Sequence, residues 1–213
     1  MNFKSNCQIA IIALLGLACS AQSRSIAHLL EGIRNGDIAS IYDAGRTGDP
    51  TFTPVLRDRL KQSDRDSERD ALKMAFAKLG DTHELQLFYC EARESFGLHI
   101  STRALEYIGG GYSIRVWAAL MALDPEFEKA KLPDSFDVRS DPPSWLALHE
   151  LPRIVPNPPI KRGSPSSLEE HAEAVQQWRA WIDSHSDEID HLQPNGKGVI
   201  FSKSACRGMK RSR

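Results

Sequence analysis

The sequence predicts an all-α protein, a short α–α superhelix followed by a proline-rich extended segment and a C-terminal capping helix. Three observations indicate this fold. Apolar residues recur at helical spacing through much of residues 26–123, and a degenerate repeat ends each helical pattern at a glycine. Beyond this region, nine of the 12 prolines fall between residues 124 and 166. One helix pair of this size cannot bury its apolar face alone, so successive pairs should stack.

Residues 1–21 are predicted to be a secretory signal peptide. Lys4 gives a positive start, residues 9–18 form an apolar run of suitable length, and small residues follow it for cleavage. Two alternatives stay open: a lipoprotein signal that anchors Cys19, although Gly16 replaces the usual branched aliphatic residue, or an uncleaved anchor, although a span needs roughly 20 apolar residues. We expect an exported protein, periplasmic or secreted, that meets a membrane only through such an anchor.

The cysteines support the same compartment. Without the leader, which contains Cys7 and Cys19, only Cys90 and Cys206 remain, and two thiols allow one intramolecular pair. We predict a disulfide between them, which would restrict the unfolded chain by on the order of 4 to 5 kcal/mol. The alternative is two unpaired cysteines, with Cys90 buried on its helix.

The helical region is predicted to occupy residues 22–124. Residues 26–35 carry aliphatic side chains at helical spacing, and a second short helix starts at Asp37. Asp49 before Pro50 predicts the next helix start, because Asp caps a helix and proline suits its first turn. The apolar stripe of that helix continues to about residue 61.

The clearest copy of the repeat is residues 67–81. Gly80 can adopt the left-handed conformation that ends a helix, and Asp81 can cap the helix that follows over residues 82–94. Related pairs occur 32 residues earlier at Gly48-Asp49 and 29 residues later at Gly109-Gly110.

These patterns resemble the HEAT-like repeats of bacterial proteins, including the type described in phycobilin lyases. The likeness rests on A-G-R-T-G-D-P (residues 44–50), A-F-A-K-L-G-D (75–81) and R-A-L-E-Y-I-G-G (103–110). It covers about residues 38–124 and departs from the family pattern at Thr47, where an aliphatic residue is usual, and at Gly110, where Asp is usual. The resemblance implies a superhelix but no activity, because no residue matches a catalytic motif of the lyases.

Residues 98–108 and 112–123 are predicted to form the last helix pair, with Gly109, Gly110 and Gly111 as a tight turn between them. A phosphate-binding loop is the alternative for this glycine run. That loop needs a preceding strand and a following Lys-Ser or Lys-Thr, and the sequence has neither.

Residues 125–166 are predicted to lie extended across the helical array. Prolines prevent a long helix, so we expect at most a short one near residues 145–151. The segment also holds apolar side chains such as Trp145 and Leu148 that need burial. It would therefore cover the end of the array.

Residues 167–192 are predicted to form a capping helix. Ser166 or Ser167, with Glu169 and Glu170 three residues on, matches a capping box. Tryptophans at helical spacing on this helix indicate packing.

Residues 193–213 form a basic tail, of which residues 198–202 are predicted to dock as a short extended piece that brings Cys206 to the fold. The tail carries six basic residues, and the chain without these and Lys4 holds 20 basic and 28 acidic residues. Since a nucleic-acid binder carries a basic face on its folded domain, we expect no nucleic-acid partner.

No catalytic, cofactor-binding or metal-binding motif is recognised. His185 and His191 are six residues apart, which does not put them on one helical face, and H-E-x-x-H, C-x-x-C and G-x-S-x-G are missing from the sequence. We therefore predict a non-enzymatic module that binds an unknown protein or peptide. The candidate partner-binding residues, expected on exposed helix faces, are Lys73, Arg103, Glu106 and Tyr107.

Two alternatives to this function remain. One is a lyase-like protein that handles a chromophore or small ligand in a pocket beside the proline-rich segment. The other is a structural component of an envelope assembly. A visible spectrum after incubation with tetrapyrroles would test the first, and elution on a sizing column the second.

Overall fold

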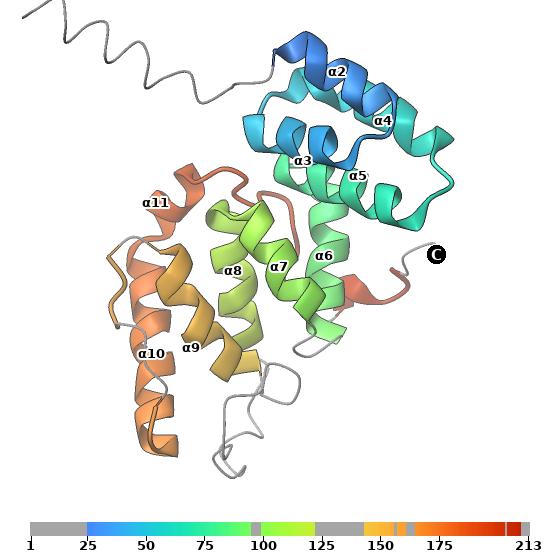
Figure 1. The fold of residues 1–213 in the computed structure, drawn as a ribbon. Helices are drawn as coiled ribbons and strands as arrows, with labels where there is room; N and C mark the ends of the chain where they lie inside the picture. The colour runs from blue at the N-terminus through green and yellow to red at the C-terminus, as the bar shows by residue number, and fades with distance from the viewer. Residues whose placement is uncertain are drawn as a thin grey trace, which may run out of the picture.

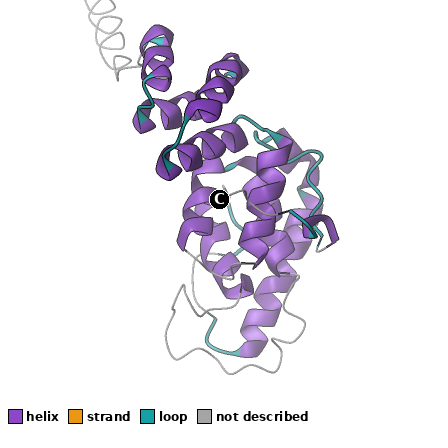
Figure 2. Cartoon of the chain, turned by 90° about the vertical axis from the view of Figure 1, so that its right-hand side faces the viewer, coloured by secondary structure: helices purple, strands orange, loops and turns teal. Residues whose placement is uncertain are grey.

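The computed structural model describes residues 25–94, 99–121, 143–155, 157–160, 165–202 and 204–209. Within these ranges every regular element is helical (Figures 1 and 2), which confirms the all-α prediction. The predicted leader at residues 1–21 and much of the proline-rich segment lie outside the described residues.

The N-terminal helices pack around a first apolar core. They are α2 (Ile26–Arg34), α3 (Ile38–Thr47), α4 (Thr53–Gln62) and α5 (Asp66–Lys78), with the 3₁₀ turn η1 (Pro50–Phe52) before α4. Their starts follow the predicted signals: the Asp37 carboxylate accepts the Ser40 N–H at 3.0 Å, and the Asp49 carboxylate accepts the Thr51 N–H at 2.9 Å. Buried aliphatic and aromatic residues of these helices form the core, among them Ile33, Ile41, Phe52, Leu56, Leu72 and Phe76.

A second core joins the remaining helices. These are α6 (Thr82–Glu94), α7 (His99–Ile108), α8 (Gly110–Met121), α9 (Pro143–Ile154), α10 (Leu168–Ser184) and α11 (Ser186–His191), followed by the 3₁₀ turn η3 (Ser204–Cys206). Its largest fully buried side chains include Trp178, Tyr89 and Tyr112.

The glycines at positions 48, 80 and 109 each lie at a corner after a helix. Gly48 follows α3, Gly80 follows α5 and Gly109 follows α7, and their φ angles of 69°, 89° and 61° are all left-handed. After the second corner, the Asp81 carboxylate accepts the Glu84 N–H at 3.1 Å, as a cap of α6. Each corner therefore ends one helix and allows the next to start at once.

The corner arrangement brings alternate helices into contact. Helix α3 packs against α5, α5 packs against α7, and α6 contacts α8. In Figure 1 the α2–α5 group lies above the group formed by α7 to α10, with α6 leading from one to the other. Helix α5 is central, because it contacts α3, α4, α6 and α7.

The central position of α5 corrects one expectation from the sequence. Lys73 was expected on an exposed face, but only 8% of this residue is accessible, and Ala77 on the same side is fully buried. Helical periodicity shows which face is apolar, whereas the neighbours that cover a helix on several sides come from the tertiary packing.

The proline-rich segment also differs from its prediction where the structure describes it. Helix α9 covers Pro143–Ile154 and contains Pro152, so this part is a helix of 12 residues that is longer than the short one predicted. It packs against α8 and α10, and Trp145, Leu146 and Leu151 are buried there. Burial of this apolar face outweighs the single backbone hydrogen bond that proline removes near the helix end.

The predicted capping helix is divided in two. Ser167 is the N-cap of α10, its hydroxyl accepts the Glu170 N–H at 3.1 Å, and the Glu170 carboxylate accepts the Ser166 N–H at 2.6 Å. This reciprocal pattern is close to the predicted capping box. Helix α10 ends at Ser184, and α11 starts after His185, which lies between them.

The glycine run does not form a three-residue turn. Helix α8 begins at Gly110, directly after the Gly109 corner. A Cβ atom at Gly110 would lie 2.6 Å from the Gln193 carbonyl carbon, and one at Gly111 would lie 2.2 Å from the Ile189 carbonyl oxygen. These two glycines therefore let the C-terminal backbone approach the start of α8.

The C-terminal segment then docks on α6. The Gln86 side-chain amide donates to the Ile200 carbonyl at 3.1 Å and accepts the Ile200 N–H at 2.8 Å. Phe201 packs edge-to-face on Tyr89, and Cys90 is bonded to Cys206. The structure confirms the predicted disulfide and the predicted docking of residues 198–202, but this piece includes turns at Gly198 and Ser202 and is not extended throughout.

Candidate functional site

A pocket of about 490 Å³ lies where three alternate helices, α3, α5 and α7, meet near their corners. Helix α3 supplies Arg46, α5 supplies Lys78, and α7 supplies the rest of the lining, which is Arg103, Glu106 and Tyr107. Three cationic side chains and one carboxylate thus share a single pocket.

Three of these residues have the same place relative to a glycine. Arg46, Lys78 and Tyr107 each stand two positions before Gly48, Gly80 and Gly109, respectively. Because α3 packs on α5 and α5 packs on α7, the C-terminal parts of these helices bring the three side chains to one pocket.

Tyr107 forms the apolar wall of the pocket and joins α7 to α3. Its hydroxyl donates to the Tyr42 carbonyl at 2.8 Å, and its ring meets the Tyr42 ring edge-to-face at 5.0 Å. The absence of a side chain at Gly45 makes room, since a Cβ there would lie 2.2 Å from the Tyr107 hydroxyl oxygen. Burial raises the pKa of the Tyr107 phenol, so it stays a neutral donor at ordinary pH.

Arg46 lies above this wall. Its guanidinium carbon is 5.4 Å from the centre of the Tyr107 ring, and its Nη1 atom is 2.7 Å from an Asp43 carboxylate oxygen. Both partners keep the guanidinium near the pocket, although the Arg46 side chain is 59% exposed. The Asp43 ion pair is a surface interaction that water screens.

Lys78 lies deeper. Its ammonium donates to the Ile108 carbonyl at 2.7 Å, where the C-terminal end of α7 favours positive charge. Burial lowers the pKa of Lys78, and repulsion from Arg46 lowers it further. Among the described residues, no carboxylate forms an ion pair with Lys78.

Arg103 and Glu106 are exposed on the outer side of α7. Glu106 is 3.4 Å from an Arg153 nitrogen of α9, so its charge is shared with a cation outside the pocket. Arg103 makes no ion pair with any residue in the described ranges. The pocket therefore has more positive charge than its own carboxylate neutralises.

Three of the four candidates from the sequence line this pocket, namely Arg103, Glu106 and Tyr107. The fourth, Lys73, is buried in α5 and is not part of the lining. Sequence reasoning missed Arg46 and Lys78. Their shared position two residues before a corner glycine was the available signal, because it predicts that they align with Tyr107.

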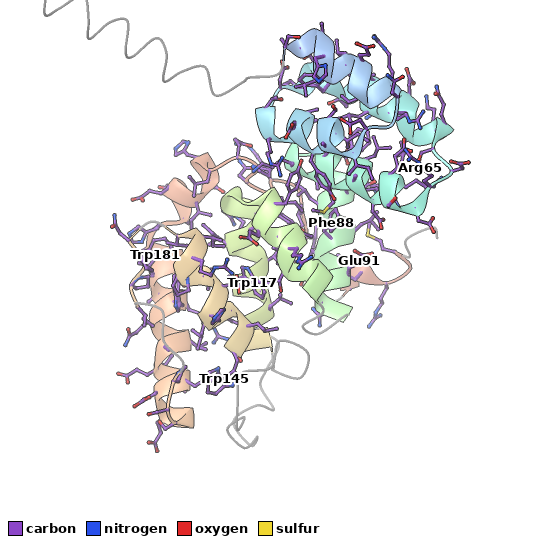
Figure 3. All side chains as sticks on the ribbon, in the orientation of Figure 1. Arg65, Phe88, Glu91, Trp117, Trp145 and Trp181 are labelled. Carbon is purple, nitrogen blue, oxygen red and sulfur yellow. A yellow bond between two sulfur atoms is a disulfide. The ribbon has the colours of Figure 1, made fainter. Side chains whose placement is uncertain are left out.

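One buried serine–histidine contact has the composition of a catalytic pair. Ser144 Oγ lies 3.1 Å from His171 Nε2, and His171 stacks on Trp145 with ring centres 4.4 Å apart (Trp145 is labelled in Figure 3). Ser144 is 1% exposed, however, so a substrate has no access to its hydroxyl in this structure. We interpret the contact as a structural hydrogen bond between α9 and α10.

The described part of the chain contains no group of three or more His, Cys, Asp or Glu side chains placed to hold a metal ion. None of its helices is both long enough and apolar enough for a bilayer span.

Fold and site together describe an all-helical protein with a cationic pocket at helix corners. Comparisons with protein-family models, with curated proteins and with solved structures find no match to this chain.

Proposed function

We propose that this chain is an exported, non-catalytic binding module of the HEAT-like type that contacts a protein or peptide partner at the pocket of Arg46, Lys78, Arg103, Glu106 and Tyr107. The observation that carries the proposal is the origin of the pocket: Arg46, Lys78 and Tyr107, from the alternate helices α3, α5 and α7, each stand two positions before a corner glycine. Repeat arrays present partners with surfaces built in this way.

Three features support the repeat architecture. The corner glycines have similar left-handed φ angles, the helices before them pack in succession, and a cap restarts the chain after each of the first two corners. A HEAT-like array would give all three, because each copy is one helix pair that needs its neighbour for burial.

Export is supported by the Cys90–Cys206 disulfide, because disulfides persist in oxidising compartments and are rare in reducing ones. Export through residues 1–21, with release or with a lipid anchor at Cys19, is part of the proposal.

Site-specific photo-crosslinking tests the function. A benzoylphenylalanine in place of Arg103 should form an adduct with a partner protein in the native host, whereas the same group in place of Arg57, which is exposed on α4, should not. The partner identified by mass spectrometry is then purified and titrated against the wild type and against a variant with alanine at both Arg46 and Arg103.

The proposal predicts at least about tenfold weaker binding by that double variant, since each lost charged contact costs about 1.5 kcal/mol or more. Equal adducts at both positions, no adduct at Arg103, or unchanged affinity of the double variant would each contradict it.

A small ligand is the second candidate, because a volume of about 490 Å³ falls within the range of small-molecule sites. This pocket lies between α3, α5 and α7, which differs from the position beside the proline-rich segment that a lyase-like function was expected to use. New visible absorbance on incubation with tetrapyrroles, lost in the same double variant, would favour the second candidate.

A further inference from the structure

We propose that the pocket binds a carboxylate group of an acidic peptide segment, with Lys78 and Arg103 as its principal cationic contacts. This inference rests on the proposed function and specifies the chemistry of the partner. It starts from the charges of the lining, where three cations face one carboxylate.

The cations differ in how far the protein already neutralises them. Arg46 is paired with Asp43 at 2.7 Å. Among the described residues, Lys78 donates only to the neutral carbonyl of Ile108, and Arg103 forms no ion pair. An ammonium has three N–H donors and a guanidinium has five. Both groups therefore have donors left for an incoming anion.

Partial burial makes the Lys78 position favourable for an anion. Its ammonium has lost part of its hydration and lies near the Arg46 guanidinium, and both effects lower its pKa. An anion bound to the Lys78 ammonium would relieve this repulsion in a region of lower effective dielectric, where charge-assisted hydrogen bonds are stronger.

Glu106 limits the charge of the ligand. Its carboxylate lines the same pocket and is neutralised only in part by Arg153 at 3.4 Å. A doubly charged phosphate would experience more repulsion from Glu106 than a singly charged carboxylate. The wall formed by the Tyr107 ring also suits the short aliphatic stem of a glutamate or aspartate side chain.

Fluorescence anisotropy with the full chain tests this inference. The probe is a fluorescein-labelled peptide of alternating glycine and glutamate, and the matched probe replaces each glutamate by glutamine. We expect the glutamate probe to bind at least about tenfold more tightly, equivalent to one charge-assisted contact. Arg103→Gln should weaken binding about tenfold. Arg57→Gln makes the same change at an exposed position of α4 and should alter binding less than about twofold.

A second variant tests the role of Lys78, and a competition experiment tests the preference for a carboxylate. Lys78→Met should also reduce binding, and its circular dichroism reports whether the loss of the Ile108 contact affects folding. At equal ionic strength, kept constant with sodium chloride, acetate should displace the probe at a lower concentration than inorganic phosphate does. The inference is overturned if the two probes bind alike, if neither binds, if Arg103→Gln matches the wild type, or if phosphate is the better competitor.

The experiments distinguish a failure of the carboxylate specificity from a failure of the partner-binding function. A partner that crosslinks at Arg103 together with a glutamate probe that does not bind would overturn only the carboxylate specificity. A glutamate probe that binds, without any protein adduct at Arg103, would leave an anion site and remove the partner-binding function.

Discussion

At the scale of single residues, Glu68 is the clearest stabilising group. It is fully buried at the third position of α5 and is bound by two arginines, Arg59 from α4 and Arg65 before α5 (Arg65 is labelled in Figure 3). The same arginines donate to the Arg34 and Gly36 carbonyls at 3.2 and 2.9 Å, at the end of α2. One carboxylate thus joins three helices.

The arginines lower the pKa of Glu68 from 4.5 to about 2, chiefly through the Arg59 hydrogen bond and against the effect of burial. Because the pKa is lower in the folded chain than in the unfolded chain, the carboxylate stabilises the fold fully above about pH 4.5, and this contribution disappears as the pH falls toward about 2.

Glu68→Gln should therefore reduce the free energy of unfolding by about 2 to 3 kcal/mol at pH 7, because two charge-assisted contacts are weakened. The difference between variant and wild type should shrink as the pH falls from 4.5 to 3. Urea unfolding at several pH values measures both effects. Glu31→Gln, an exposed change on α2, is the control and should cost less than about 0.5 kcal/mol. A pH-independent difference would contradict the assignment.

At the scale of elements, the start of α8 is fixed by contact with the C-terminal segment. The Gly111 N–H donates to the Leu192 carbonyl at 2.9 Å, and the Tyr112 N–H donates to the Pro194 carbonyl at 2.9 Å. Both donors belong to the first turn of a helix, where backbone N–H groups lack partners within the helix. The C-terminal segment therefore caps α8 from a distance of about 80 residues along the chain.

Two glycine-to-alanine variants separate backbone conformation from this contact. Gly48 and Gly110 have similar φ angles of 69° and 63°, but a Cβ at Gly48 meets nothing within 4 Å, whereas one at Gly110 lies 2.6 Å from the Gln193 backbone. Gly48→Ala should cost about 1 kcal/mol, from the left-handed conformation alone. Gly110→Ala should cost about 3 kcal/mol, because displacement of the docked backbone adds to that strain. Equal losses in thermal or urea unfolding would show that the contact contributes nothing.

At the scale of the whole molecule, the tail closes the fold on itself. Cys206 bonds to Cys90 across 116 residues, and Phe201 packs between the Tyr89 and Tyr112 rings. This connection ties the end of the chain to α6, the helix that leads from the N-terminal helices to the second core (Figure 1). The loop it closes includes α7 to α11.

Peptide mapping without reduction should find the Cys90 and Cys206 peptides covalently joined. Cys206→Ser should lower the free energy of unfolding by about 4 to 5 kcal/mol, since a loop of this length loses much of its unfolded-state entropy on closure. Reduced wild-type protein should unfold with the stability of the variant. Separate Cys90 and Cys206 peptides from the oxidised protein would contradict the pairing.

Much of the fold could be predicted from the sequence, because the signals are local. The cap at Asp37, the corner at Gly80 and the capping box around Ser167 involve residues at most four positions apart, so their geometry is largely independent of the rest of the chain. The exposure of Lys73 and the length of α9 were predicted wrongly. The exposure of Lys73 and the length of α9 both depend on which other helices pack against α5 and α9, and the apolar pattern of one helix does not contain this information.

The candidate site likewise combines features that the sequence predicts with features that depend on the tertiary structure. The sequence determined the helices, the corner glycines and the residue types before each corner, because backbone sterics and capping act within one or two turns. Only the tertiary structure decided that α3, α5 and α7 pack in succession, and thereby brought Arg46, Lys78 and Tyr107 to one pocket while burying Lys73. Contacts between helices depend on side-chain packing summed over distant parts of the chain, which no local pattern specifies.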